Sequence, residues 1–144
     1  MLLIEKDLKQ GDHIYVKRKR LLYSHHGIYA GKGAVIHYKG ADKEKRDPAV
    51  IITDIDNFLN SGKLRRRNYK KRFPYSETLR IATEHLSKKG YSLAFNNCEH
   101  FAAYCVTGKK KSVQVRRVIG GIATITLAVT VSVIQKMIAK KKVG

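Results

Sequence analysis

Cysteine is scarce in this sequence, and its scarcity excludes one class of small protein. The 144 residues include only Cys98 and Cys105. Two cysteines are too few for a disulfide framework. If both lie on one helix, their spacing of seven residues separates them by about 10 Å along the axis, which is too far for a bridge. Both are therefore predicted to be free thiols in a reducing compartment.

Acidic residues are also few, since 11 Asp and Glu stand against 30 Lys and Arg, for a formal net charge of +19. This excess favours polyanionic partners, either nucleic acid or a membrane that carries anionic lipid. Seven of the ten residues in the run Lys63–Arg72 are basic, so the run either contacts such a partner or is a solvated loop. Tyr69 is the run's one aromatic residue, a weak stacking platform, so nucleic acid is the less favoured partner.

Two further absences concern targeting and metals. The opening MLLIEKDLKQGD has no apolar h-region, so we expect no secretory signal peptide and an intracellular protein. The histidines and cysteines show no ligand spacing such as paired Cys-x-x-Cys. We therefore expect no metal, and no other cofactor is indicated.

Apolar residues make up 43% of the chain, which is typical of a folded domain. Strand-forming residues and turns predict a strand in 11–18, a hairpin over 26–40 with its turn at Gly31–Gly33, and a strand that ends near Thr53. Helices are predicted from an Asp54 cap, from a Ser76 cap to Gly90, and from Cys98 to Gly108, after an extended segment over 91–95. Strands come mainly first and helices later, so the fold class is α+β, an antiparallel sheet with packed helices.

The last part of the chain has a different character. Residues 118–134 carry no charge, and a helix of that length is about 25 Å long, slightly under the roughly 30 Å of a hydrocarbon core. Cations on both sides favour a membrane helix, although alternation from Thr124 to Val133 also fits a half-buried strand. We therefore predict a catalytic domain over 1–112 and a basic-flanked membrane anchor over 113–144.

Cys98 is the candidate nucleophile, because a cysteine in the first turn of a helix has a lowered pKa. A nearby histidine would take its proton and hold the thiolate as an ion pair. His25 and His37 lie on the two arms of the predicted hairpin and are near cross-strand neighbours, so one imidazole can orient the other. His100 points away from Cys98 around the helix, and His85 is predicted to lie on the surface.

Two segments resemble the signature blocks of the lecithin:retinol acyltransferase-like family. They are HHGIYAGKGAVIHY, from His25, and NNCEHFAAYC, from Asn96. This family includes small phospholipase A/acyltransferases and is a circularly permuted branch of the papain-like thiol hydrolases. The opening KQGDHIYVKR resembles its first strand, and the apolar C-terminal run resembles the tail of membrane-anchored members. The resemblance thus covers nearly the whole chain.

The resemblance implies a role for each matching residue. Cys98 aligns with the nucleophile, His25 with the general base and His37 with the residue that orients the base. Tyr23 stands where some members carry a tyrosine that helps to stabilise the oxyanion. His26 occupies a position that is often aromatic in the family, and is a departure from its pattern.

The function implied is that of a membrane-associated acyltransferase or phospholipase A, which acts on glycerophospholipid esters through a thioester on Cys98. Its partners would be the phospholipid substrate and an anionic membrane surface, reached through the basic runs and the C-terminal segment. Two alternatives stay open. One is a cysteine peptidase or amidase on the same fold, and the other is a non-catalytic basic module that binds membranes or nucleic acid.

Overall fold

The computed structural model describes residues 2–18, 23–40, 47–86, 88 and 97–109. In chain order, its elements are the 3-10 turn η1 (Glu5–Asp7), the strands β1 (His13–Lys17), β2 (Ser24–Gly31), β3 (Ala34–Lys39) and β4 (Ala49–Asp54), the helix α1 (Ile55–Leu59), the strand β5 (Arg65–Arg66), and the helices α2 (Tyr75–Glu84) and α3 (Cys98–Thr107). Most strands precede the longer helices, which confirms the α+β prediction.

One antiparallel sheet of five strands, in the order β4-β3-β2-β1-β5, forms the centre of the domain. Its hairpin of β2 and β3 was predicted from the turn residues. Gly31, Lys32 and Gly33 all have positive φ, at 93°, 49° and 73°, a conformation that glycine adopts without steric cost. This turn sets Ile28 opposite Ile36.

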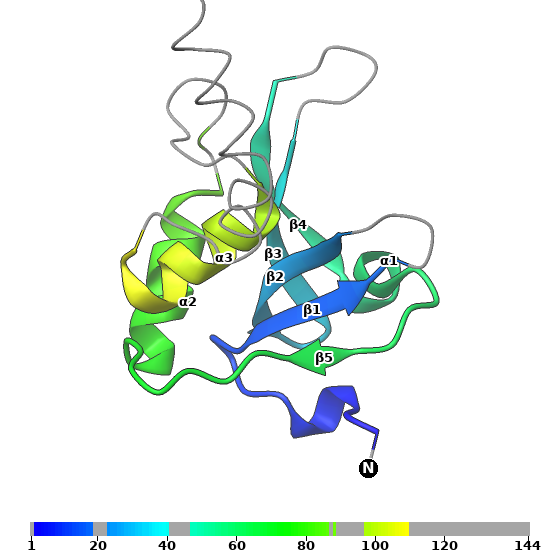
Figure 1. Ribbon diagram of the computed structural model, residues 1–144. Helices are drawn as coiled ribbons and strands as arrows, with labels where there is room; N and C mark the ends of the chain where they lie inside the picture. Colours follow the sequence, from blue (N-terminus) through cyan, green and yellow to red (C-terminus); the bar gives the residue numbers. More distant parts are fainter. Residues whose placement is uncertain (1, 19–22, 41–46, 87, 89–96, 110–144) are drawn as a thin grey trace, which may run out of the picture. The chain divides into compact units, whose positions relative to one another are not determined.

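The two faces of the sheet pack against different helices (Figure 1). Side chains of β2 and β3 alternate between the faces, as a period of two requires. Ile28 and Ile36 belong to the core that includes residues of α2 and α3. Val35 belongs to the other core, with Phe58 of α1. Cys98 lies on the face that carries α3.

Two helices begin beside the polar cap residues from which the sequence predicted them. The Asp54 carboxylate accepts from the amide of Asn57 at the start of α1, and the Asn97 side chain accepts from the amide of His100 at the start of α3. Such caps satisfy amides that have no partner inside the helix. Gly108 ends α3 with a φ of 71°, in the left-handed conformation typical of a helix terminator.

The start of α2 differs from the prediction. Pro74, and not Ser76, is the N-cap residue, so Ser76 lies within the first turn. Proline with extended backbone is well suited to precede a helix, because its missing N–H needs no partner there. The helical segment ends at Glu84, short of the predicted end at Gly90, which lies outside the described residues.

Two predicted elements, the extended segment over 91–95 and the apolar segment over 118–134, lie outside the described residues. Among the helices within the described ranges, none has both the length and the apolar character needed to cross a membrane.

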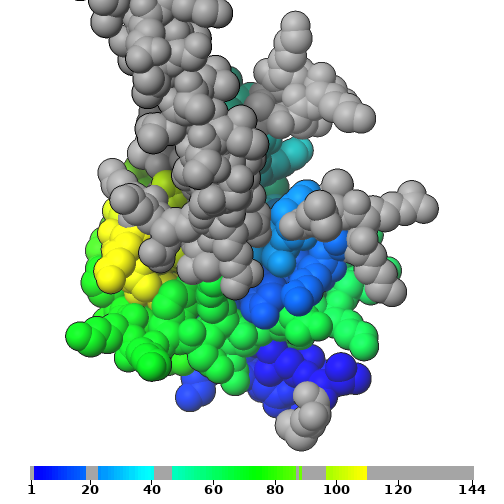
Figure 2. All heavy atoms as spheres, viewed as in Figure 1, coloured from blue at the N-terminus to red at the C-terminus, as the bar shows by residue number. Residues whose placement is uncertain are grey.

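Arginines of the basic run bind backbone and carboxylates of the domain itself. Arg66 of β5 donates to the Asp7 carbonyl at 3.0 Å, and Arg72 donates to the Gly11 carbonyl at 2.9 Å. In Figure 2 the N-terminal residues (dark blue) lie beside the green segment that contains β5. This part of the run is therefore structural, which neither interpretation of the sequence anticipated.

Candidate active site around Cys98, His25 and His37

The two histidines of the hairpin meet in space as predicted. His25 Nε2 lies 3.1 Å from His37 Nδ1, and the two rings meet edge to face. His37 Nε2 lies 3.1 Å from the Thr53 hydroxyl oxygen on β4. Because both ring nitrogens of His37 have partners, its orientation is fixed, and it fixes the ring of His25 in turn.

Both imidazoles lie in a largely apolar setting. The Phe58 ring contacts the rings of His25 and His37, with centroid distances of 4.9 and 5.5 Å. Burial, together with the charge of Arg18, lowers the pKa of His25 to about 4. Burial and the neighbouring His25 are the leading causes that lower the pKa of His37 to about 4. Both rings are therefore neutral at pH 7, the state in which an imidazole accepts a proton.

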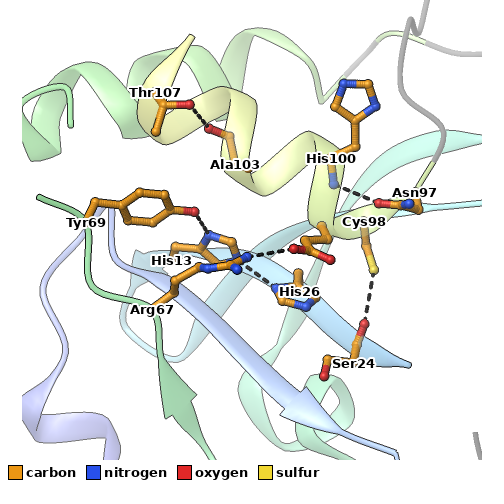
Figure 3. Close-up of polar contacts among 11 residues, drawn as sticks. His13, Ser24, His26, Arg67, Tyr69, Asn97, Cys98, His100, Ala103 and Thr107 are labelled. Carbon is orange, nitrogen blue, oxygen red and sulfur yellow. Dashed lines mark hydrogen bonds and ion pairs between the residues drawn. The ribbon is translucent and has the colours of Figure 1, made fainter. Parts of the chain in front are cut away.

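Cys98 is the first residue of α3, and its side chain is buried at 8% exposure. Its thiol donates to the Ser24 carbonyl at the start of β2, at 3.7 Å (Figure 3). Burial raises the pKa of Cys98, and backbone amides of His26, Glu99 and Cys98 itself oppose this effect only in part. The expectation that the helix start lowers this pKa is therefore wrong, because desolvation outweighs the amide dipoles.

The Cys98 thiol and the His25 ring lie on different faces of β2. Alternation along β2 puts Ser24 and His26 on the face covered by α3 and puts His25 on the face covered by Phe58. Among the described residues, the hydrogen bond of the Cys98 thiol is to Ser24, and that of the His25 ring is to His37. The structure thus brings the two histidines together and places Cys98 beside the strand end that carries His25.

Tyr23 precedes β2, and its side chain is 43% exposed. It lies next in sequence to Ser24, whose carbonyl receives the Cys98 thiol. The tyrosine is thus near the start of β2 but faces solvent.

The structure also contains a second pair of histidines in contact, which was not predicted from the sequence. His13 Nε2 lies 2.8 Å from His26 Nδ1, and His13 Nδ1 lies 2.7 Å from the Tyr69 hydroxyl (Figure 3). His13 and His26 are both buried, at 0% and 4% exposure. The alternation of β1 and β2 could have placed them on one face, but only once the register between these strands was known.

The residues that follow Cys98 have structural contacts. The buried Glu99 carboxylate accepts from Arg67 at 2.8 Å, which ties the start of α3 to the basic run. His85 is half-buried, with its ring against Phe101 and Tyr104, so the prediction that it lies on the surface is wrong. Within the parts of the chain that the structure describes, no three His, Cys, Asp or Glu side chains converge as metal ligands would.

The raised pKa of Cys98 and the lowered pKa of His25 predict a neutral resting pair, and not the ion pair expected from the sequence. The rate of alkylation by iodoacetamide is expected to rise about tenfold per pH unit up to at least pH 8, because the thiolate is the nucleophile. Mass spectrometry of the modified protein measures this rate, with Cys98→Ser as the background. A rate that is constant from pH 5 to 8 would instead indicate a preformed ion pair.

Comparison with known proteins gives one family and several distant relatives. The sequence model of a family described as "Lecithin retinol acyltransferase" matches residues 6–111. Protein LEAD-SENSITIVE 1 of Arabidopsis thaliana is 28% identical over 69% of the chain. Lecithin retinol acyltransferase of Rattus norvegicus is 28% identical, and that of Mus musculus 26% identical, each over 75% of the chain. The chain spans only 58% of the length of each of these relatives.

Proposed function

Since the chain belongs to the lecithin retinol acyltransferase family, we propose that it is a thiol acyltransferase or phospholipase A acting on acyl esters of glycerophospholipids. One observation carries the proposal: the oriented, neutral pair of His25 and His37 lies on the hairpin whose first residue contacts the Cys98 thiol. A nucleophile, a base and a residue that orients the base are the parts that covalent acyl transfer requires.

In the proposed first step, His25 accepts the Cys98 proton while the sulfur attacks the ester carbonyl carbon. The electron pair of the C=O bond moves to the oxygen, and the resulting oxyanion re-forms the carbonyl as the glycerol oxygen leaves. The leaving oxygen takes the proton from His25. The products are a thioester on Cys98 and a lysolipid.

The second step decides between two activities. Water that attacks the thioester releases a fatty acid, which gives net phospholipase A activity. An amine or hydroxyl acceptor gives acyl transfer instead. In both cases His25 takes the proton of the incoming group and returns it to the Cys98 sulfur as the thioester bond breaks. Hydrogen bonds of catalytic pairs commonly tighten only when substrate is bound, so the contacts of His25 and Cys98 in the free protein are compatible with this role.

The proposed substrate lies in a membrane, and features of the sequence support an approach to it. Basic residues near an anionic surface each contribute about 1 kcal/mol to binding, and the chain carries 30 of them. We extend the proposal to a catalytic domain over 1–112 with the circularly permuted papain-like fold of its family. Residues 113–144 would anchor that domain to an intracellular membrane.

The test uses the full chain mixed with phosphatidylcholine vesicles that contain anionic lipid. Intact mass spectrometry should detect an adduct of fatty-acyl mass on the wild type, and no adduct on Cys98→Ala. The matched control is Cys105→Ala, which removes the other buried cysteine and should keep the adduct. Fatty acid released in the same tube reveals turnover that is too fast for the adduct to accumulate.

Neither adduct nor released fatty acid from folded wild-type protein, with several lipids, would overturn the proposal. A peptidase or amidase that uses the same residues, or a non-catalytic basic module, would then be the better account. An adduct that persists in Cys98→Ala would place the chemistry on another residue.

A further inference from the structure

A chain of hydrogen bonds runs from the basic run to the start of β2, on the face of the sheet that carries Cys98. It connects Tyr69 to His13 at 2.7 Å and His13 to His26 at 2.8 Å. His26 stacks on Tyr15, and His13 is fully buried. The proposed mechanism uses none of these side chains.

Each imidazole in this chain carries a single ring proton at neutral pH. Burial, followed by the charges of Arg67 and His25, lowers the pKa of His26 to about 3. Burial is also the leading cause that lowers the pKa of His13 well below its ordinary value, helped by the neighbouring His26. A neutral imidazole donates through one nitrogen and accepts through the other, so the chain has a single direction.

The Tyr69 hydroxyl decides this direction. Burial raises the pKa of Tyr69 to about 12, so the hydroxyl keeps its proton. Among the described residues, His13 Nδ1 is the hydrogen-bond partner of this hydroxyl, at 2.7 Å. A neutral phenol binds a ring nitrogen more strongly as a donor than as an acceptor. The Tyr69 hydroxyl therefore donates its proton to His13 Nδ1. His13 Nε2–H then donates to His26 Nδ1, which leaves the remaining proton of His26 on Nε2.

His26 adjoins the nucleophile. The backbone of His26 is near enough to the Cys98 sulfur to lower the pKa of that thiol, and Figure 3 shows the His26 side chain between His13 and the Cys98–Ser24 contact. Among the residues that the structure describes, Nε2 of His26 has no hydrogen-bond partner, so its N–H is available to a ligand.

We propose that His26 is a catalytic hydrogen-bond donor, whose Nε2–H binds the substrate carbonyl oxygen and the oxyanion that forms when Cys98 attacks. His13 and Tyr69 are positioning residues that hold the proton on His26 Nε2. This inference rests on the proposed function, because the oxyanion arises only in acyl transfer. It also assigns different roles to two adjacent residues, since His25 accepts a proton and His26 donates a hydrogen bond.

The tautomer of His26 is the first test, and it needs no substrate. In the full chain with isotope-labelled histidine, nitrogen–proton correlation NMR should find His26 neutral at pH 7 and protonated at Nε2. Tyr69→Phe removes the donor that sets the direction and should produce a mixture of the two tautomers. A wild-type His26 that is charged, or protonated at Nδ1, would overturn the proposal.

The second test separates donation to an oxyanion from reactivity of the thiol. His26→Leu should slow acylation of Cys98 by a p-nitrophenyl ester roughly a hundredfold, the usual effect of losing one oxyanion donor. Alkylation by iodoacetamide forms no oxyanion and should change by less than about threefold. His26→Gln supplies an amide N–H and should recover part of the acylation rate. His85→Gln, a half-buried histidine elsewhere, is the matched control and should acylate normally.

Two results of these assays would overturn the donor role of His26 without overturning the proposed function. Equal loss of acylation and alkylation in a folded His26→Leu would give His26 the role of base or a purely structural role, and would overturn the donor. Unchanged acylation in that variant would overturn it as well.

Octanal provides a readout that does not depend on turnover of lipid. The aldehyde carbon bonds to the Cys98 sulfur, and the thiol proton moves to the aldehyde oxygen. That oxygen then takes the place of the oxyanion. Loss of one neutral hydrogen bond should weaken octanal binding by His26→Leu about tenfold. If this loss is found while phospholipid gives neither adduct nor fatty acid, the donor stands and the proposed substrate is wrong. Equal octanal binding by the wild type and His26→Leu would overturn the donor role of His26 and leave the proposed function standing.

Discussion

Acidification from pH 7.5 to pH 5.5 is expected to lower the free energy of unfolding of this protein by roughly 3–5 kcal/mol. The cause is the set of four buried histidines that the fold keeps neutral, which are His13, His25, His26 and His37. In the unfolded chain each imidazole titrates near its ordinary pKa of about 6.5.

The sign follows from the lowered pKa values. Above pH 6.5 the folded and unfolded chains both hold these rings neutral, so their full contribution to stability is present there. As the pH falls from 6.5 towards about 4, where His25 and His37 titrate in the folded protein, the unfolded chain binds more protons than the folded one. Each ring then costs about 1.4 kcal/mol for each pH unit.

Urea unfolding at a series of pH values measures this effect. The slope of the free energy of unfolding against pH, near pH 5.5, should correspond to uptake of two to four protons, whereas His37→Asn should reduce it by about one. Since small domains are stable by only about 5–15 kcal/mol, acid unfolding is expected to begin between pH 5 and 6. Stability that is independent of pH over this range would contradict the neutral burial of these histidines.

Local signals in the sequence were enough to predict the hairpin and the contact between His25 and His37. A turn at Gly31–Gly33 fixes the register of β2 on β3, and register alone determines which side chains meet. The start of α3 at Cys98 was also predictable, because the polar cap and the terminating Gly108 are both local.

Contacts between distant segments were not predictable in the same way. The pairing of His13 with His26 depends on the register of β1 on β2, and the sequence between these strands, RKRLLY, has no Gly, Pro, Asn or Asp to indicate a turn. Tyr69 and Arg67 belong to a run whose composition is typical of a solvated loop, yet the fold turns both side chains towards the buried histidines and Glu99. The pKa of Cys98 was predicted with the wrong sign, because burial at the sheet is a property of the tertiary structure.

Phe58→Ala is expected to destabilise the protein by about 3–5 kcal/mol, the usual cost of truncating a buried aromatic ring. Phe58 is 2% exposed, and it lies in the core formed by α1 and one face of the sheet. The cost combines lost burial of the ring with the cavity left behind. Phe58→Leu fills most of this volume and should cost about 1–2 kcal/mol. Urea unfolding at pH 7.5 measures both values.

The same substitution should also weaken the effect of acid. The Phe58 ring covers His25 and His37, and a cavity in its place admits water, which reduces the desolvation that lowers the pKa of both histidines. Their pKa values should therefore move up towards 6.5. The slope of stability against pH should then fall by up to two protons in Phe58→Ala and stay close to the wild-type slope in Phe58→Leu. A Phe58→Ala protein that loses stability but keeps the full slope would show that elements other than this ring desolvate the pair.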